Sequence, residues 1–406
     1  MNTDPPSPAM RAPPQPLAGL RVVEFTHMVM GPTCGMVLAD LGAEVIKVEP
    51  MQGEGTRRLL GAGPGFFPMF NRNKKSIAID LRQPAGAEVA RRLALSADVV
   101  AENFKPGTLS KYGLDHARLA ARNERLIYVS HKGFLPGPYE HRTALDEVVQ
   151  MMGGLAYMTG RPGDPLRAGT SVNDIMGGLF GAIGVLGALI QRGITGKGMQ
   201  VQSALFENNV FLMGQHMLQY AMTGRHPQPM SARDNPWAVY DVFTVRNGEQ
   251  IFLAAVSDAQ WQVFCKMLGF EDLMADPKLA TNNDRVQQRP QLLATLRERL
   301  AARGAGELAG LFERAGLPFA PIRRPEDLYE DPHLQATGGL ADVVLPDGPK
   351  AGQTVKTTLF PITMDGERLG VRLHPPHLGE HTTALLSALG YGDAEIAELR
   401  LLKLVA

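Results

Sequence analysis

Strands and helices alternate along the first third of the chain, and this alternation constrains the fold more than any other feature. Short runs rich in β-branched residues predict strands at 20–25, 44–49, 76–80, 98–101 and 126–130. Helices are expected near 31–41, 84–95 and 115–122. Such a pattern forms a mostly parallel sheet with helices on both faces, and its ligands bind at the carboxyl ends of the strands.

The alternation of strands and helices does not continue after residue 224. Residues 201–224 are expected to form a helix, and 225–238, rich in Pro, Arg and Asn, are typical of a linker. A hairpin is predicted at 239–244 and 250–255, and helices near 258–268, 287–303 and 306–315 precede a strand at 317–323. The tail is expected to add strands near 341–346 and 354–360 and helices near 382–389 and 393–401. We therefore predict an α/β chain with a Rossmann-like large domain (17–224 and 330–406) and a smaller α+β domain (225–329).

Composition narrows the class of function. Forty-one basic and 41 acidic residues cancel, so neither nucleic acid nor a membrane surface is expected as a partner. The two cysteines, Cys34 and Cys265, lack metal-type spacing and favour a reducing compartment. Residues 1–16 are rich in proline and lack an apolar core, which indicates a disordered tail and no secretion signal. A cytoplasmic enzyme without a metal site is expected.

One acid, Asp174, stands directly before a long apolar run dense in glycine and alanine that ends near Gly196. Ser171, Asn173 and Asp174 are all N-cap residue types, so a helix starting near Ile175 would hold the Asp174 carboxylate at its positive end. The alternative is a purely structural cap. The run approaches the length of a membrane span, but its glycine content and the neighbouring acid favour a buried core helix.

Nucleotide-redox motifs are missing from the sequence, whereas cations are frequent near the predicted strands. No G-x-G-x-x-G turn follows the first strand, and neither a P-loop nor a G-x-S-x-G elbow occurs. Lysines and arginines at 72, 74, 75, 82, 105, 111 and 132 are expected on loops beside the strands. Such a group can bind the phosphates of a ligand, although each cation taken alone fits an ordinary solvated loop.

Six stretches together resemble the class III CoA-transferases, a family that includes formyl-CoA:oxalate and L-carnitine CoA-transferases and, as a sister branch, α-methylacyl-CoA racemase. They are 17–48, 73–80, 100–107, 152–160, 174–198 and 378–382. The resemblance implies an interlocked, ring-like homodimer that acts on an acyl-CoA and a small carboxylic acid, with no permanently bound cofactor. It also implies that Asp174 is the covalent nucleophile.

The resemblance assigns coenzyme A contacts as well: Val29, Met30, Ile79, Arg82, Asn103, Phe104, Lys105, Lys111, Arg142, Thr143, Ala144 and Leu145. Lys105 and Lys111 are the expected phosphate partners. Val29 and Pro50 depart from the formyl-CoA transferase pattern, which has glutamine and arginine there, and residues 225–260 lack its glycine-rich loop. Formyl-CoA and oxalate are therefore not the expected substrates, and succinyl-CoA with a short acid is the default pair.

Three hypotheses remain open from the sequence: a transferase, a racemase and a silent acyl-CoA-binding protein. Leu145 stands where the racemases have their histidine and cannot transfer a proton, and His141 lies four residues too early. Arg142, and His27 after the first strand, are candidates for a distal substrate carboxylate. The backbone around Gly177 and Gly178 is a candidate for stabilising the oxyanion.

Overall fold

The computed structural model describes residues 14–233 and 235–406, and these form two compact units. The first comprises the chain up to Ser231 together with Pro332–Ala406, and the second is Ala232–Asp331. Most of the predicted tail, residues 1–16, lies outside the described residues. We describe each unit by itself.

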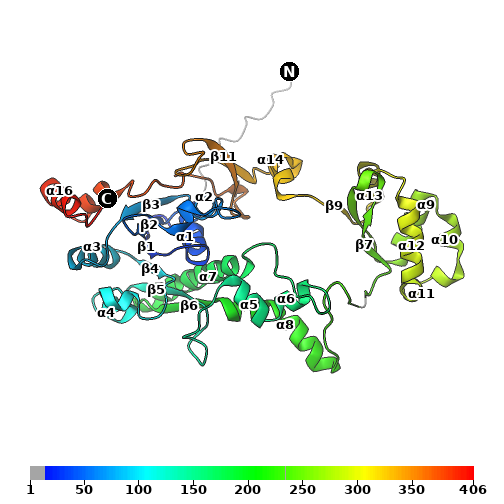
Figure 1. Ribbon diagram of the computed structural model, residues 1–406, viewed down its shortest axis with the longest axis horizontal. Helices are drawn as coiled ribbons and strands as arrows, with labels where there is room; N and C mark the ends of the chain where they lie inside the picture. The colour runs from blue at the N-terminus through cyan, green and yellow to red at the C-terminus, as the bar shows by residue number, and fades with distance from the viewer. Residues whose placement is uncertain (1–13, 234) are drawn as a thin grey trace, which may run out of the picture. The chain divides into compact units, whose positions relative to one another are not determined.

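The large unit is built on a parallel six-stranded sheet whose order is β3-β2-β1-β4-β5-β6. All of its strand pairs are parallel, and the strands follow one another in this order in Figure 1. The strands are β1 Arg21–Phe25, β2 Glu44–Glu49, β3 Lys74–Ala78, β4 Val99–Glu102, β5 Ile127–Lys132 and β6 Gln200–Ala204. The order reverses between β1 and β4, which is where ligands of such sheets bind.

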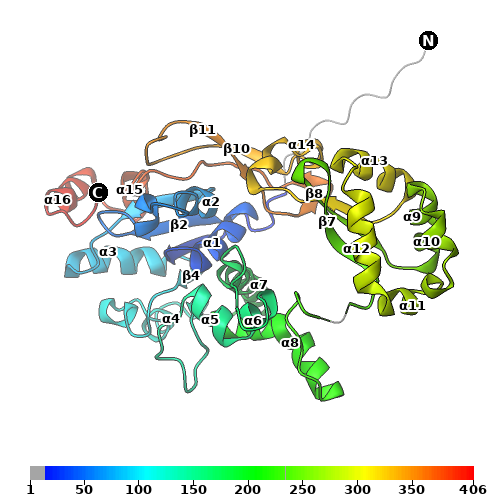
Figure 2. The same ribbon diagram turned by 45° about the vertical axis from the view of Figure 1, so that its right-hand side comes forward.

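Alternate strand residues face two different helical layers. Val23 and Val100 pack under α3, α4, α15 and α16, whereas Val22 and Val99 pack under α1 and α7. Figures 1 and 2 show α3 and α16 at the same end of the unit. The helices of the two layers are α1 Met30–Asp40, α3 Pro84–Leu95, α4 His116–Ala120, α7 Val172–Thr195, α15 Thr382–Ala388 and α16 Asp393–Leu401.

Further elements extend the large unit. The first unit also contains α2 Phe66–Phe70, α5 Asp146–Met152, α6 Leu155–Thr159 and α8 Leu205–Thr223. The C-terminal part contributes α14 Pro332–Ala336, β10 Leu340–Val344, β11 Thr354–Thr358, β12 Thr363–Met364 and β13 Glu367–Arg368. The chain end is fastened to β3, because Ala406 N–H donates to Ala78 O and Asp80 N–H donates to Leu404 O.

The small unit contains a three-stranded antiparallel sheet, β7-β8-β9, covered by helices. Trp261, Phe264 and Phe312 are buried in its core. Its elements are β7 Val239–Thr244, β8 Gln250–Ala255, α9 Asp258–Leu268, α10 Glu271–Ala275, α11 Asn282–Gln287, α12 Arg289–Leu300, α13 Ala305–Ala315 and β9 Phe319–Pro321.

Two sequence expectations are wrong at the level of elements. Residues 201–224 are not one helix: β6 pairs with β5 before α8 begins at Leu205. The long helix α7 begins at Val172, so Asp174 lies in its first turn and Ser171 occupies the N-cap position. Asp174 is therefore still at the positive end of the helix, among N–H groups that have no partner within the helix.

Glycines let α7 lie close to its neighbours in the large unit. A Cβ at Gly178 would lie 2.5 Å from Met30 O on α1, and one at Gly181 would lie 2.2 Å from Cε1 of His131 on β5. By length and composition alone α7 is apolar enough to cross a membrane. In the fold, however, one face of it forms part of a helical layer on the sheet.

Candidate active site

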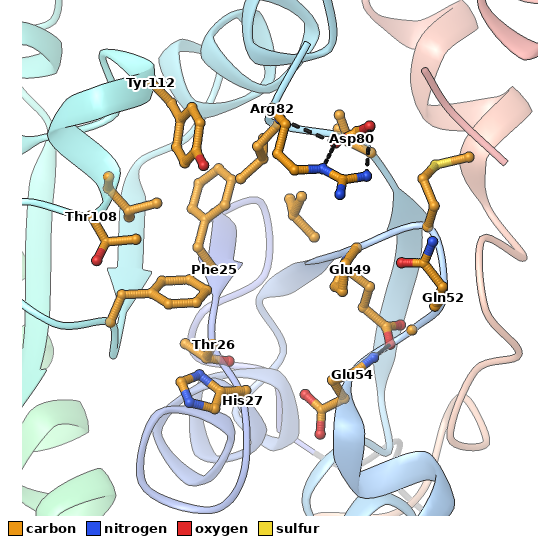
Figure 3. Close-up of a pocket in the computed structure, with 18 of the residues that line it drawn as sticks. Phe25, Thr26, His27, Glu49, Gln52, Glu54, Asp80, Arg82, Thr108 and Tyr112 are labelled. Carbon is orange, nitrogen blue, oxygen red and sulfur yellow. Dashed lines mark hydrogen bonds and ion pairs between the residues drawn. The ribbon is translucent and has the colours of Figure 1, made fainter. Parts of the chain in front are cut away.

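A cavity of about 440 Å3 opens at the carboxyl ends of β1, β2, β3 and β4 (Figure 3). Its walls are largely apolar. They come from strand ends and the loops that follow them: Phe25, Val48, Pro50, Ile79, Leu81, Phe104, Leu109 and Tyr112. The volume and the apolar walls fit a heteroaromatic ring system, as small-molecule sites commonly do.

One wall of the cavity joins the loops after β1 and β4. The Asn103 side chain accepts from His27 N–H at 3.0 Å and donates to His27 O at 2.7 Å. These two hydrogen bonds hold the loop after β1 against the loop after β4. The His27 ring stacks on Phe104 with centroids 5.2 Å apart. Burial and the nearby Lys47 lower the pKa of His27, so the ring is neutral at pH 7 and makes a poor partner for a substrate carboxylate.

The opposite wall is the loop after β2, held from behind by Arg57. Arg57 donates to both carboxylate oxygens of Glu49 at 2.6 and 2.7 Å, and it also contacts Asp347 and Pro376 O in the C-terminal part. Its guanidinium lies 3.7 Å from the centroid of the Phe67 ring. Bidentate pairing of this kind fixes geometry, so the wall is a rigid feature of the fold.

Asp174 lies in a separate, partly buried environment at the start of α7. Burial, together with the negative charge of Asp146, raises the pKa of Asp174 to about 7, and Arg167 opposes this shift. A carboxylate with a pKa near 7 is more basic, and more nucleophilic when ionised, than an ordinary aspartate. Such a perturbed acid at a helix N-terminus is a candidate reactive group.

Asp146, the first residue of α5, organises the approach to Asp174. Its Oδ1 accepts from Asn173 N–H at 2.9 Å and its Oδ2 accepts from Gln150 Nε2 at 2.8 Å. Gln150 in turn accepts from Ala168 N–H. Asp146 is buried, so this chain of hydrogen bonds fixes the loop before α7 while keeping a second negative charge close to Asp174.

The structure contradicts the expectation that Gly177 and Gly178 donate to an oxyanion. Both are buried in the second turn of α7, where N–H groups are engaged in the helical ladder. The space beside Gly177 is filled by Met30 Cε and Asn208 Nδ2, and the space beside Gly178 by Met30 and Thr33. Asp174, by contrast, lies in the first turn, where backbone N–H groups have no acceptor within the helix.

The residues expected to contact coenzyme A fall into several places. Ile79, Arg82 and Phe104 line the cavity, and Asn103 supports it from behind. Lys105 and Lys111 are exposed and line two further depressions beside it. Val29 and Met30 are buried at the start of α1.

The remaining candidates, Arg142, Thr143, Ala144 and Leu145, lie in the loop before α5. Arg142 is exposed, and its guanidinium stacks 3.9 Å from the centroid of the Tyr139 ring. Leu145 is exposed at the N-cap position of α5. None of the four lines the main cavity.

Part of the predicted cation cluster is structural. Arg72 and Lys74 lie at the amino end of β3, opposite to the cavity, and both are buried. Arg72 pairs with Asp40 at 2.6 Å and Lys74 with Glu24 at 2.8 Å. Lys132 is also engaged, with Glu102 at 2.6 Å. The prediction that Arg72 and Lys74 bind phosphate is wrong, because buried acids distant in sequence already neutralise them at the end of the sheet away from the cavity.

Several wall residues were not predicted from the sequence. Phe25, Thr26, Val48, Thr108 and Tyr112 all line the cavity. Their common signal is position, since each ends a strand or follows one at the carboxyl edge of the sheet. Pro50, recognised only as a departure from the formyl-CoA transferase pattern, also lines this wall.

No group of three His, Cys, Asp or Glu side chains suited to hold a metal ion occurs within residues 14–233 and 235–406. Cys34 and Cys265 are both buried and unpaired. Burial raises the pKa of each thiol to about 12, so neither is a reactive thiolate.

Comparison with known proteins defines the class to which this fold and site belong. The model of the CoA-transferase family III matches residues 17–382. A succinate–glutarate CoA-transferase from Agrobacterium fabrum is 33% identical over 92% of this chain and 96% of its own, and a formyl-CoA:oxalate CoA-transferase from Rhodopseudomonas palustris is 32% identical over 94% and 95%. The crystal structure of a CAIB/BAIF family protein from Brucella suis is similar with a TM-score of 0.83 and 36% identity, covering 93% of this chain and all of that one.

The chain therefore belongs to the CoA-transferase family III, and the protein is a CoA-transferase. The resemblance of the sequence to the class III CoA-transferases is confirmed. CoA thioesters and carboxylic acids are the substrates of this class.

Proposed function

We propose that this enzyme moves coenzyme A from succinyl-CoA to a short dicarboxylic acid, with Asp174 as the covalent nucleophile. The observation that carries the proposal is the environment of Asp174, a partly buried carboxylate at a helix N-terminus beside a second acid. The dicarboxylate pair is suggested by the relative named as a succinate–glutarate CoA-transferase. The missing glycine-rich loop and Val29 still disfavour formyl-CoA and oxalate.

The reaction proceeds by exchange of bonds of similar energy. An Asp174 oxygen attacks the thioester carbonyl, the C–S bond breaks, and a mixed anhydride and CoA thiolate form. The thiolate then attacks the aspartyl carbonyl, which releases succinate and leaves coenzyme A as an aspartyl thioester. The acceptor carboxylate attacks this thioester and the same steps run in reverse. No proton is consumed, so the protein contributes positioning, exclusion of water and stabilisation of the oxyanion.

The chain offers groups for each contribution. The cavity walls around Phe104 and Ile79 suit the adenine ring of coenzyme A, and Lys111 and Arg82 beside it suit the phosphates. The free N–H of Asp174 is a donor for the oxyanion. Arg142 is the proposed partner of the distal carboxylate, since His27 is neutral.

The racemase hypothesis loses support at one position. Leu145 at the N-cap of α5 has a hydrocarbon side chain, so it transfers no proton. A transferase that uses Asp174 as its nucleophile does not need a proton-transferring side chain at this position. A silent binding protein would not need a carboxyl group whose pKa is raised to about 7.

We infer that the enzyme works as a homodimer in the cytoplasm. The outer faces of α7 and α8 expose Ile190, Ile194, Phe211 and Met222, each with at least 70% of its surface accessible. Apolar faces of this size are usually covered by a partner. The two unpaired, buried cysteines suit a reducing compartment.

The test is transfer from succinyl-CoA to a panel of acids of two to six carbons, with products separated by liquid chromatography and identified by mass. We expect a new acyl-CoA with one or two dicarboxylates, and Asp174→Ala should lower the rate by at least about 10⁴-fold while CoA binding remains. Residual activity of Asp174→Ala above roughly one per cent would contradict the nucleophile. Activity with oxalate alone would contradict the proposed substrates.

A further inference from the structure

Four cations surround a depression of about 450 Å3 that adjoins the main cavity. The depression and the cavity share Leu81, Arg82 and Tyr112 as lining residues. The cations are Arg82, Arg91, Lys111 and Arg118, from the loop after β3, from α3, from the 3-10 turn Leu109–Tyr112 and from α4. Arg91 and Arg118 do not line the main cavity.

The three arginines are held in place at one edge while another edge stays open. Arg82 donates through Nε and Nη2 to Asp80, and Arg91 donates through the same two atoms to Glu88. Arg118 donates through Nη1 to Asp115 and to Ser110 O. Within the described chain, Nη1 of Arg82, Nη1 of Arg91 and Nη2 of Arg118 make no hydrogen bond (Figure 3 shows the Arg82 pair).

Glycine keeps the floor of the depression open. Gly113 has a positive φ of 71° and caps the turn Leu109–Tyr112. A Cβ there would lie 3.3 Å from Arg91 Nη1 and 4.0 Å from Arg118 Cδ, so the two arginines lie close to the same glycine. Guanidinium groups already fixed by a carboxylate lose little freedom when they bind an anion at their open edge. The neighbouring Lys111, which makes no ion pair in the described chain, adds uncompensated positive charge.

We propose that Arg91 and Arg118 bind the 3′-phosphate of coenzyme A and make the enzyme prefer CoA over its 3′-dephospho form. This inference rests on the proposed function, because it places the adenosine part of a CoA ester in the main cavity. The 3′-phosphate is attached to the ribose beside adenine, so an adenosine in that cavity brings a phosphomonoester dianion to the shared edge at Arg82 and Tyr112. A dianion with three free oxygens matches several charge-assisted donors better than a diester does.

The test compares the dissociation constants of CoA and 3′-dephospho-CoA by calorimetry on the full-length protein. Arg91→Gln and Arg118→Gln should each weaken CoA binding by about three- to tenfold, and both should change 3′-dephospho-CoA binding by less than about twofold. Unchanged binding of the dephospho form also shows that each variant is folded. Arg122→Gln, which removes an exposed cation outside the depression, is the matched control and should change neither constant.

Three results would overturn the inference, and they are distinguishable. If the variants weaken both ligands equally, the depression binds another part of the molecule. If they weaken neither, the depression takes no part in binding, while the transferase proposal stands. If the unaltered protein binds neither ligand at millimolar concentration, the CoA site in the main cavity fails together with the inference. The preference for CoA should also shrink as salt rises from 0.01 to 0.5 M, since exposed charges are screened.

Discussion

Two groups of buried acids in the large unit differ in how their charge is compensated. The first group is Glu24 on β1 and Glu54 in the loop after β2. Glu24 contacts Lys74 at 2.8 Å and Lys47 at 3.7 Å, and Glu54 contacts Lys47 at 2.6 Å. At the start of α7, the negative charge of another acid, Asp146, acts on Asp174, and Arg167 partly offsets it.

The difference separates a structural role from a chemical one. Buried charges that meet opposite charges stabilise one arrangement of the loops. Buried charges of the same sign raise a pKa and leave a group that gains by reacting. The proposed nucleophile Asp174 thus differs in its surroundings from Glu24, which is more deeply buried and is paired with Lys74.

The largest effect on stability is expected from Lys74→Met. This change leaves the fully buried Glu24 with Lys47, which lies 3.7 Å away and is already paired with Glu54, so the free energy of unfolding should fall by about 3–5 kcal/mol. Denaturation by urea measures it. The double variant Glu24→Gln/Lys74→Met should recover much of the lost stability. If Lys74→Met alone lowers the free energy of unfolding by less than about 1 kcal/mol, the structural role of Lys74 is contradicted.

Asp174→Asn should raise the free energy of unfolding, whereas Lys74→Met should lower it. Because the pKa of Asp174 is raised from 3.8 to about 7 in the folded protein, its charge lowers stability progressively as pH rises through that window. The asparagine variant should therefore be more stable than the original by roughly 1–3 kcal/mol at pH 8 and equally stable at pH 3.5. Urea denaturation at the two pH values checks this, and a less stable variant at pH 8 would refute the uncompensated charge.

The pH dependence of the rate sharpens the same comparison. The nucleophile must be ionised, so kcat/KM should fall as pH drops below about 7. Asp146→Asn removes the neighbouring charge and should move this acid limb down by roughly half to one pH unit. An unmoved limb would mean that burial alone sets the pKa. Asp164→Asn, an exposed acid in the loop before α7, serves as control.

The smallest effect is expected at an exposed cation. Lys111→Ala should raise the apparent KM for CoA esters by about three- to tenfold and change kcat by less than about twofold, because phosphate binding is nearly the same in substrate and transition state. Steady-state kinetics at low and high salt measures this. A defect confined to kcat would remove Lys111 from the CoA site.

Much of the fold could be predicted because its signals are local. The hairpin strands Val239–Thr244 and Gln250–Ala255 and the helix Pro84–Leu95 fall where the pattern indicated. The strand Gln200–Ala204 did not, since its short polar run leads directly into α8 and only its pairing with β5 defines it.

The site was harder to predict from the sequence, because its interactions join residues that are distant in the chain. Lys74 resembles a phosphate ligand until Glu24, fifty positions earlier, is placed 2.8 Å away. Similarly, the hydrogen bond between Asn173 N–H and Asp146 depends on how α5 packs against α7. Local patterns predict elements, whereas the partner of a charge depends on the tertiary fold.

The central claim, that Asp174 becomes covalently attached to coenzyme A, is tested most directly by mass spectrometry of the intact protein and its peptides. After incubation with succinyl-CoA, we predict a CoA-sized adduct on the peptide that contains Asp174, discharged by the accepted dicarboxylate and absent from Asp174→Asn. Absence of any adduct on a protein that binds CoA and still transfers it, or an adduct on a different residue, would contradict the account.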